Sequence, residues 1–365
     1  MIVMGMPLWA WIVFYVAVLF MLIVDLKMFG RKGQHEVNVA EAMRMTVVWI
    51  AVSLLFCVGI YFLYPVEAHV TGGDVSLIRQ EKALEFLAGY LIEKSLSMDN
   101  LFVFLMLFSY FGIERKYQHE VLFWGIFGAL VLRSIFIFAG AAAVERFEWV
   151  LGLFGVFLIY TGGKMFFHDE DETPDLSKNF IVRGFGKFFP VTKELHGEKF
   201  FIKDRKPVNI LSIFKFQFST FRKATPLFVA LLVIETTDVA FAVDSIPAVF
   251  SVSRDPFIVL TSNIFAILGL RALYFALAAV AQYFKLLKYG LGVILVFVGC
   301  KMLLGLYGIE ISTPVSLAVI VGVLALSVVF SLMFTKDEAS PDSETSAEEE
   351  VSNGDGCDNT SKVSK

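Results

Sequence analysis

Long apolar runs dominate the chain. They are near the length of about 20 residues that a helix needs to cross the hydrocarbon core of a bilayer. Nine such runs lie near residues 8–28, 43–64, 84–111, 120–143, 149–167, 226–251, 256–281, 288–306 and 314–334. Hydrophobic residues make up 57% of the sequence, which excludes an ordinary soluble domain. The pattern predicts an all-α, polytopic membrane protein with nine transmembrane helices.

Two of these runs carry charges where a spanning helix is normally apolar. One reads LIEKSLSMDNLFVF (91–104) and the other VIETTDVAFAVDSIP (233–247). Their charged residues are Glu93, Lys94 and Asp99 in the first run, and Glu235, Asp238 and Asp244 in the second. A charged carboxylate at the centre of a spanning helix costs about 2.5–3.5 kcal/mol on insertion scales. Five carboxylates are difficult to explain by packing alone, so we predict a cation site.

Asp99 and Asp244 are the principal predicted ligands, because both fall near or somewhat past the middle of the bilayer. The further candidate ligands are Asp238, Glu93, Glu235, Asn100 and Ser245. Residues six apart on a helix differ by about 240°, so Asp238 and Asp244 do not share a face of a straight helix. Glu235, Asp238 and Ser245 do form one stripe. Pro247 favours local unwinding, which would leave the Val243 carbonyl free.

An all-oxygen ligand set suits manganese, magnesium or calcium, and ligand type alone does not separate these ions. The alternative is that the acids form buried salt bridges with Lys94, Arg133 and Arg271. We expect these three residues to support the site by holding carboxylates in place. Asp25 and Asn263 are weaker candidates, for which a packing role is the alternative.

Three landmarks recur in order along the chain. Glu93 and Asp99 match Asp238 and Asp244, and Arg133 matches Arg271. GVFLIYTGGKM (155–165) matches GVILVFVGCKM (292–302). Because each copy contains three helices, the second copy must be inverted relative to the first. Inverted repeats with a site at the midplane are typical of secondary transporters.

The distribution of lysine and arginine predicts an outside N-terminus and a cytoplasmic C-terminus. Most of the 31 Lys and Arg residues fall in the segments this topology places inside, whereas the outer loops hold only Arg79, Lys82, Arg146 and Arg254. The expected organisation is 1–79, two N-terminal helices; 80–167, the first repeat; 168–223, a cytoplasmic loop; 224–308, the inverted repeat; 309–335, the last helix; and 336–365, a disordered acidic tail.

The remaining composition argues against other classes of function. The formal net charge is −4, so there is no strong signal for nucleic-acid binding. The three cysteines, Cys57, Cys300 and Cys357, are scattered, which predicts neither a disulfide framework nor a soft-metal site. We expect no enzymatic activity and no permanently bound cofactor. The expected partners are the lipid bilayer and the transported cation.

At its acidic motifs the chain resembles the TerC family of integral membrane proteins, especially its Alx-like branch. The resemblance covers roughly 80–335. It includes GYLIEKSLSMDN (89–100), FFPVT (188–192), ATPLF (224–228), IETTDVAFAVDSIPA (234–248), RDPF (254–257) and TSNIFAILGLRALYFAL (261–277).

The resemblance implies a multi-pass metal exporter of the bacterial inner membrane, most often linked to Mn²⁺ efflux. The acidic motif residues would form the ion site, and the fold would be an inverted repeat related to the LysE-type exporters. Proton counter-transport is plausible, since buried carboxylates exchange protons for metal. Two alternatives remain open: a factor for assembly or metal loading of exported proteins, with a partner in the secretion machinery, and a tellurium-resistance protein.

Overall fold

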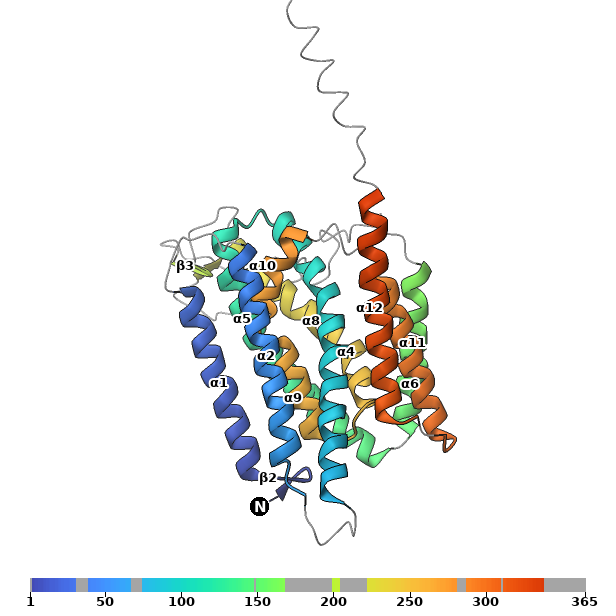
Figure 1. Ribbon diagram of the computed structural model, residues 1–365. Coiled ribbons are helices and arrows are strands. Elements are labelled where there is room, and N and C mark those ends of the chain that lie inside the picture. Colours follow the sequence, from blue (N-terminus) through green and yellow to red (C-terminus); the bar gives the residue numbers. More distant parts are fainter. Residues whose placement is uncertain are drawn as a thin grey trace, which may run out of the picture.

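The computed structural model describes residues 2–30, 39–66, 74–147, 149–167, 199–203, 222–280, 287–309 and 311–337. Its helices are α1 (Leu8–Gly30), α2 (Val39–Leu63), α4 (Val75–Tyr110), α5 (Arg115–Arg146), α6 (Trp149–Phe167), α8 (Pro226–Phe250), α9 (Pro256–Ile267), α10 (Leu270–Val280), α11 (Leu287–Leu306) and α12 (Thr313–Asp337). Two antiparallel hairpins pair β1 (Ile2–Val3) with β2 (Met6–Pro7) and β3 (Phe201–Lys203) with β4 (Arg222–Ala224). The helices form one bundle, with the N-terminal end and the last turn of α12 at opposite ends (Figure 1).

Seven described helices are long and apolar enough to cross a membrane: α1, α2, α5, α6, α8, α11 and α12. The pair α9 and α10 would make an eighth span if it crosses as one bent unit. The 36-residue α4 is not among them, and it carries Glu93, Lys94 and Asp99 within its apolar half. The expected polytopic, mainly helical membrane protein is therefore confirmed.

The bundle exposes many large apolar side chains and buries a few charged ones within a mostly apolar core. Trp9, Val16 and Phe20 on α1 are more than half exposed, whereas Glu93 and Arg133 are fully buried. Apolar side chains on the outside and charged ones in the core are what a bilayer requires, because lipid tails solvate only apolar groups. The outer surface of the bundle is thus suited to lipid contact.

Local sequence signals set where the site-bearing helices begin. Asp74 caps α4 by accepting hydrogen bonds from the Ser76 N–H (2.9 Å) and hydroxyl (2.8 Å), and these bonds lower the pKa of Asp74. Pro226 and Pro256 occupy the first turns of α8 and α9, where a missing N–H costs nothing. These starts determine which residues of each helix reach the middle of the bundle.

The seventh expected helix is broken. It was expected to run through 256–281, but α9 ends at Ile267 and α10 begins at Leu270, with a bend of 41° between them. Gly269 sits in the break with φ +83°, a conformation that glycine adopts readily. A Cβ at Gly269 would lie 2.7 Å from the Trp49 side chain of α2, so the break is packed directly against α2.

The unwinding expected at Pro247 is not observed. α8 continues from Pro226 to Phe250 with Pro247 inside it. Pro247 lies in the last turn, so its missing N–H removes a bond only near the end of the helix, where the neighbouring side chains are buried. The discontinuity belongs to the adjacent α9–α10 pair instead.

Helices α6 and α11 make the most extensive helix–helix contact of the described chain, and glycines permit it. A Cβ at Gly162 would lie 2.7 Å from the Gly292 carbonyl oxygen, and one at Gly299 would lie 2.6 Å from the Gly155 carbonyl oxygen. These four glycines come from the two matching stretches that start at Gly155 and Gly292. The first glycine of each stretch therefore meets the second glycine of the other, which is the reciprocal pattern of an antiparallel contact.

Replacing Gly162 with alanine is expected to destabilise the protein, because the new methyl group meets a backbone oxygen that cannot rotate away. Overpacking of this kind costs about 1–3 kcal/mol. The adjacent Gly163 is the matched control, since a Cβ there meets nothing within 4 Å. Thermal unfolding in detergent should show a lower midpoint for Gly162→Ala and no loss for Gly163→Ala. Equal midpoints for the two variants would contradict this account of the α6–α11 contact.

Several expected segments lie outside the described residues. Most of the predicted cytoplasmic loop (168–198 and 204–221) and nearly all of the acidic tail (338–365) are among them. The third helix begins earlier than expected, at Val75 rather than near residue 84, because the capped, polar first turns of α4 extend the helix beyond its apolar run.

Candidate functional site

A buried arginine joins acidic side chains from two other helices. Arg133, on α5, directs its guanidinium at Asp238 of α8, with Nη2–Oδ1 at 2.8 Å and Nε–Oδ2 at 3.1 Å. The third guanidinium nitrogen, Nη1, forms an ion pair with Glu93 of α4. Two parallel bonds to one carboxylate match the fixed fork of an arginine, which a lysine cannot reproduce.

Polar side chains complete this group. Asn263 of α9 donates from Nδ2 to Glu93 Oε2 at 2.9 Å, and its Oδ1 lies 3.4 Å from Arg133 Nη1. The Ser245 hydroxyl oxygen lies 3.5 Å from the same nitrogen. We call Glu93, Arg133, Asp238, Ser245 and Asn263 the Arg133 cluster. It draws on α4, α5, α8 and α9, which belong to both halves of the predicted repeat.

The Arg133 cluster is almost sealed from solvent. Glu93, Arg133 and Asn263 have no exposed surface, and Asp238 is 5% exposed. Two carboxylates and one guanidinium give the cluster a formal charge of −1. Removing Arg133 would change this charge to −2 and leave both carboxylates without a cation, which is strongly destabilising. The cluster therefore depends on its arginine.

Glu235 lies one turn before Asp238 on α8 but outside the hydrogen-bond network of the Arg133 cluster. Its Oε2 is buried and has no hydrogen-bond partner among the described residues. The side chain occupies space left by Gly128 of α5, where a Cβ would overlap the Glu235 carboxylate. A carboxylate that interacts electrostatically with Asp238, and whose buried oxygen has no donor among the described residues, is a group available to a cation or a proton.

The two principal predicted ligands are placed differently. Asp244 points toward α6, where the Thr161 hydroxyl lies 3.5 Å from its Oδ1, and the charge of Lys164 acts on it. Asp244 is thus separate from Arg133. The backbone of Asp99 belongs to α4, but its side chain lies outside the described part of the structure. That Asp99 and Asp244 face each other stays a prediction.

The other predicted residues have roles apart from the Arg133 cluster. Asn100 is buried on α4 and forms no hydrogen bond with a described side chain. The buried amine of Lys94 donates to the carbonyl of Ala266 (3.2 Å), which lies in the last turn of α9, next to the break. It therefore binds a backbone group at a helix end, whereas we expected a carboxylate.

Arg271 pairs with the N-terminal part of the chain. Its Nη1 lies 3.0 Å from Asp25 Oδ2, which links α10 to α1. Asp25 was a weak ligand candidate and Arg271 a predicted partner of the acidic motifs. The two residues instead form a buried pair of their own, and Asp25 Oδ1 has no described partner. Arg133 and Arg271, equivalent in the repeat, thus have different partners.

Within the described ranges, no three Asp, Glu, His or Cys side chains are arranged to hold a metal ion. The guanidinium of Arg133 lies between Glu93 and Asp238. The carboxylates, the amide of Asn263 and the hydroxyl of Ser245 are all oxygen donors of the type that hard divalent cations prefer. The residues suit such an ion chemically, but Arg133 has to yield its bonds before an ion can use those oxygens.

Sequence reasoning missed three residues that shape this region. Gly128 makes room for Glu235, Thr161 faces Asp244, and Glu85 is a buried acid near the start of α4. Thr161 lies inside the repeated GVFLIYTGGKM stretch, so the repeat could have indicated it. Gly128 gives no such signal, because its role depends on which helix packs against it.

Comparison with known proteins gives consistent matches. Residues 78–339 match the family described as "Integral membrane protein TerC family". The chain is 44% identical over 336 residues to a protein of Photorhabdus laumondii named "Putative membrane-bound redox modulator Alx", covering 92% of this chain and 98% of that one. An Escherichia coli protein of the same name is 44% identical, with coverage of 90% and 95%.

A relative without a functional name is also similar. An uncharacterised membrane protein of Myxococcus xanthus is 41% identical over 335 residues, which cover 92% of this chain and 95% of the relative. No solved structure matches the chain.

Proposed function

Because the chain belongs to the TerC family of integral membrane proteins, we propose that it exports a hard divalent cation, with Mn²⁺ as the first candidate. The observation that carries this proposal is the Arg133 cluster, where buried oxygen ligands from both halves of the repeat meet. Ionisable groups buried inside a membrane bundle are expensive, and they commonly mark ion pathways. Carboxylates outnumber the single arginine in the cluster, which favours a cationic substrate over an oxyanion.

In this mechanism Arg133 acts as a resident cation. Its guanidinium neutralises Glu93 and Asp238 when no ion is present, so the site never holds two bare carboxylates. An arriving divalent ion competes for the same oxygens. Glu235, whose buried Oε2 has no hydrogen-bond partner among the described residues, supplies a further negative charge beside them. When the ion leaves, Arg133 takes back its bonds to Glu93 and Asp238.

The proposed topology has nine spans and two inverted triplets, α4–α5–α6 and α8–(α9–α10)–α11. The reciprocal glycine contacts between α6 and α11 support inversion, since equivalent helices cross antiparallel. α4 also packs on α9 as α5 packs on α8, which is the pairing that a two-fold axis would generate. An odd number of spans agrees with the start of α1 and the end of α12 lying at opposite ends of the bundle (Figure 1).

We place the protein in a bacterial inner membrane, with the N-terminus outside. The bacterial relatives and the concentration of Lys and Arg on the other side support this orientation. An exporter in this orientation takes the ion from the side of the predicted 168–223 loop and releases it near the 251–255 connection between α8 and α9.

Proteoliposomes test this function directly. The purified protein should move Mn²⁺ across the membrane. Asp238→Asn or Glu93→Gln should lower the transport rate by at least about tenfold. This is the effect expected when about 1.4 kcal/mol of ion or transition-state stabilisation is lost. Asp99→Asn and Asp244→Asn test the two principal predicted ligands in the same assay. Competition with Mg²⁺ and Ca²⁺ establishes which hard ion is preferred.

The control is Glu145→Gln, which removes an exposed carboxylate from the same helix as Arg133. It should leave Mn²⁺ transport unchanged. Wild-type rates in both Asp238→Asn and Glu93→Gln would refute the Arg133 cluster as the ion site. No Mn²⁺ movement by the wild-type protein, under conditions where it is folded, would refute export itself.

The names of the Photorhabdus and Escherichia relatives favour a second candidate, redox modulation in the membrane. In the described structure Cys57 and Cys300 are both free thiols, on α2 and α11. A variant with serine at Cys57, Cys300 and Cys357 separates the two functions. Mn²⁺ transport should survive in it, whereas thiol-based redox activity should not. An assembly or metal-loading factor predicts instead a stable partner on pull-down and little transport by the purified protein.

A further inference from the structure

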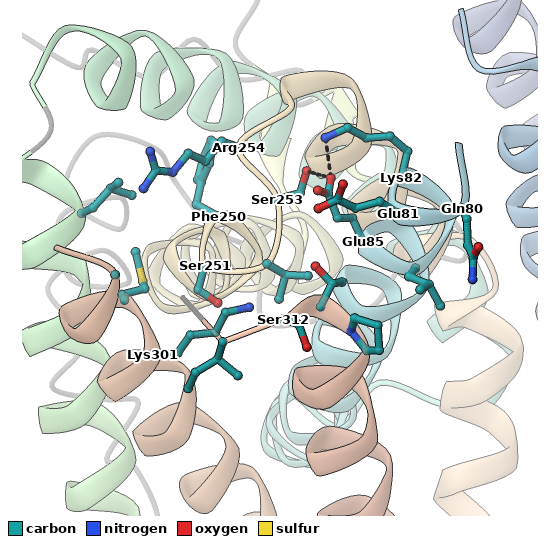
Figure 2. A pocket seen from close by; sticks show the side chains of 18 of the residues that line it. Gln80, Glu81, Lys82, Glu85, Phe250, Ser251, Ser253, Arg254, Lys301 and Ser312 are labelled. Atoms are coloured by element: carbon teal, nitrogen blue, oxygen red, sulfur yellow. Dashed lines mark hydrogen bonds and ion pairs between the residues drawn. The ribbon is translucent and has the colours of Figure 1, made fainter. Parts of the chain in front are cut away.

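A pocket of about 790 Å³ opens at one end of the bundle. It is enclosed by the first turns of α4, the 251–255 connection, the end of α11 and the start of α12 (Figure 2). The polar residues used below are Glu81, Lys82, Glu85, Ser253, Arg254 and Lys301. This is the end of the bundle that the Lys and Arg distribution places outside the cell.

Glu85 lies on the α4 wall of this pocket and is itself buried. Its Oε2 accepts hydrogen bonds from Ser253 Oγ at 2.6 Å and from Lys82 Nζ at 2.9 Å. Lys301 reaches into the pocket from α11, opposite the α4 wall, and its charge acts on Glu85 (Figure 2). Glu85 is therefore a buried acid that already has one basic partner, Lys82, and one hydroxyl donor, Ser253.

One helix, α4, joins the pocket to the Arg133 cluster, because Glu85 lines the pocket and Glu93 belongs to the cluster. Glu85, Gly89 and Glu93 are spaced four residues apart, so they lie near one another on one face of the helix. Two such steps cover about 12 Å at about 1.5 Å per residue. Between them, a Cβ at Gly89 would lie 2.8 Å from Ser262 Oγ, and Ser262 precedes Asn263 of the cluster. One layer of close packing thus separates the pocket from the cluster.

We propose that this pocket is the vestibule through which the exported divalent cation leaves, and that the contact between Gly89 and Ser262 is the barrier that closes it. The inference rests on the proposed export function and adds the exit route and its gate. To pass, the ion requires α4 to move away from α9 at Gly89. The helix break after Ile267 lies one turn beyond Asn263 on the α9 side of this barrier.

The charges of the pocket suit release rather than storage. Conduction requires that an ion bind strongly enough to enter a site and weakly enough to leave it. Lys82 and Lys301 compete with a cation for Glu85, and Arg254 adds a further positive charge at the rim. A hydrated divalent cation would therefore pass Glu85 without being retained there, as an exit requires.

Cysteine labelling from outside the cell tests the vestibule. In a background with serine at Cys57, Cys300 and Cys357, Glu81→Cys tests the pocket and Ser262→Cys tests the barrier. A membrane-impermeant maleimide should label Glu81→Cys quickly from outside, with or without Mn²⁺. It should label Ser262→Cys slowly without Mn²⁺, and at least about threefold faster when Mn²⁺ is supplied from the cytoplasmic side, because the metal shifts the population toward the open state.

Two controls make the result interpretable. Ser53→Cys replaces a buried serine of α2 away from the pocket, and its labelling should stay slow in both conditions. Gly89→Ala inserts a methyl group into the barrier and should change the labelling of Ser262→Cys even without Mn²⁺, whereas Gly59→Ala, where a Cβ meets nothing, should not.

The possible outcomes separate this inference from the export function. If the protein transports Mn²⁺ but the labelling rate of Ser262→Cys does not change with Mn²⁺, the proposed vestibule is wrong and the export function is still supported. Labelling of Glu81→Cys only from the cytoplasmic side would overturn the placement of the exit. Failure of the wild-type protein to transport Mn²⁺ would overturn both proposals together.

Discussion

Replacing Arg133 with methionine is expected to lower the free energy of unfolding by about 3–5 kcal/mol, the cost of leaving a buried ion pair without one partner. Glu93 and Asp238 would remain in the core with no cation, and Asn263 alone cannot satisfy both carboxylates. Thermal unfolding in detergent measures the loss. Arg146→Met, at the exposed end of the same helix, is the matched control and should change the midpoint little.

The cause of this loss can be isolated by neutralising the acids. Combining Arg133→Met with Glu93→Gln and Asp238→Asn removes the uncompensated charge, so the triple variant should recover most of the stability. Arg133→Lys should recover less, because an ammonium cannot bind Asp238 through two parallel bonds while reaching Glu93. A triple variant as unstable as Arg133→Met would show that Arg133 acts through packing rather than charge.

The same variants link the cluster to the proposed ion. If Arg133 is a resident cation, Mn²⁺ should partly replace it and stabilise Arg133→Met, by an amount that grows with concentration as RT ln(1 + [Mn²⁺]/Kd). The triple variant, which lacks both carboxylates, should gain little from Mn²⁺. Equal gains in the two proteins would mean that the ion binds elsewhere. Because the readout is thermal stability, the result does not depend on transport.

Much of the charged core could be predicted from sequence because buried charges must find partners. Glu93, Asp238 and Arg133 interrupt apolar helices, and an isolated charge in a membrane is too costly to remain unpaired. Sequence could not determine the partners themselves. The same reasoning predicted that Arg271 pairs with the acidic motifs. The packing of α1 against the bundle instead places Asp25 beside Arg271, and these two residues form the ion pair.

Helix geometry explains why Asp238 and Asp244 separate. Six residues turn a helix by about 240°, so Asp238 faces α5 while Asp244 faces α6. Ser245, seven residues after Asp238, returns to the same face and approaches Arg133. The angles follow from the sequence alone, whereas the identity of the helix on each side follows from the tertiary packing. The predicted contact between Asp244 and Asp99 of α4 is therefore the part of the site for which the sequence provided the least support.

The break between α9 and α10 was hidden from sequence for a different reason. Residues 256–281 form one continuous apolar run, and an isolated glycine within it is common in membrane helices. The conformation of Gly269 is fixed by its contact with Trp49, which is more than 200 residues earlier in the chain. By contrast, Pro247 was a visible local signal, yet α8 passes through it without interruption. Local helix breakers thus predicted a discontinuity, but in the wrong helix.

Replacing Gly269 with alanine is expected to cost about 2–5 kcal/mol. About 1–2 kcal/mol of this is the cost of a left-handed conformation for an L-residue. A further cost of about 1–3 kcal/mol comes from overpacking, because the new Cβ would clash with Cβ and Cγ of Trp49. Gly308 is the matched control: it has φ +81°, and a Cβ there meets nothing within 4 Å. The difference in thermal midpoint between Gly269→Ala and Gly308→Ala therefore measures the Trp49 contact.

A second substitution, at Trp49, separates the cost of the clash from the cost of the left-handed backbone conformation. Trp49→Ala in the Gly269→Ala background removes the ring atoms that clash with the new methyl group. The loss of unfolding free energy in the double variant should therefore be smaller than the sum of the two separate losses. Recovery should be incomplete, because the Cβ of residue 49 remains and is itself 2.7 Å from the position of the new Cβ. The break also joins Asn263 of the Arg133 cluster to Arg271, which α1 holds through Asp25. Gly269→Ala should therefore lower Mn²⁺ transport as well, whereas Gly308→Ala should not. Simple additivity of the Trp49→Ala and Gly269→Ala losses would show that the break does not depend on its contact with α2.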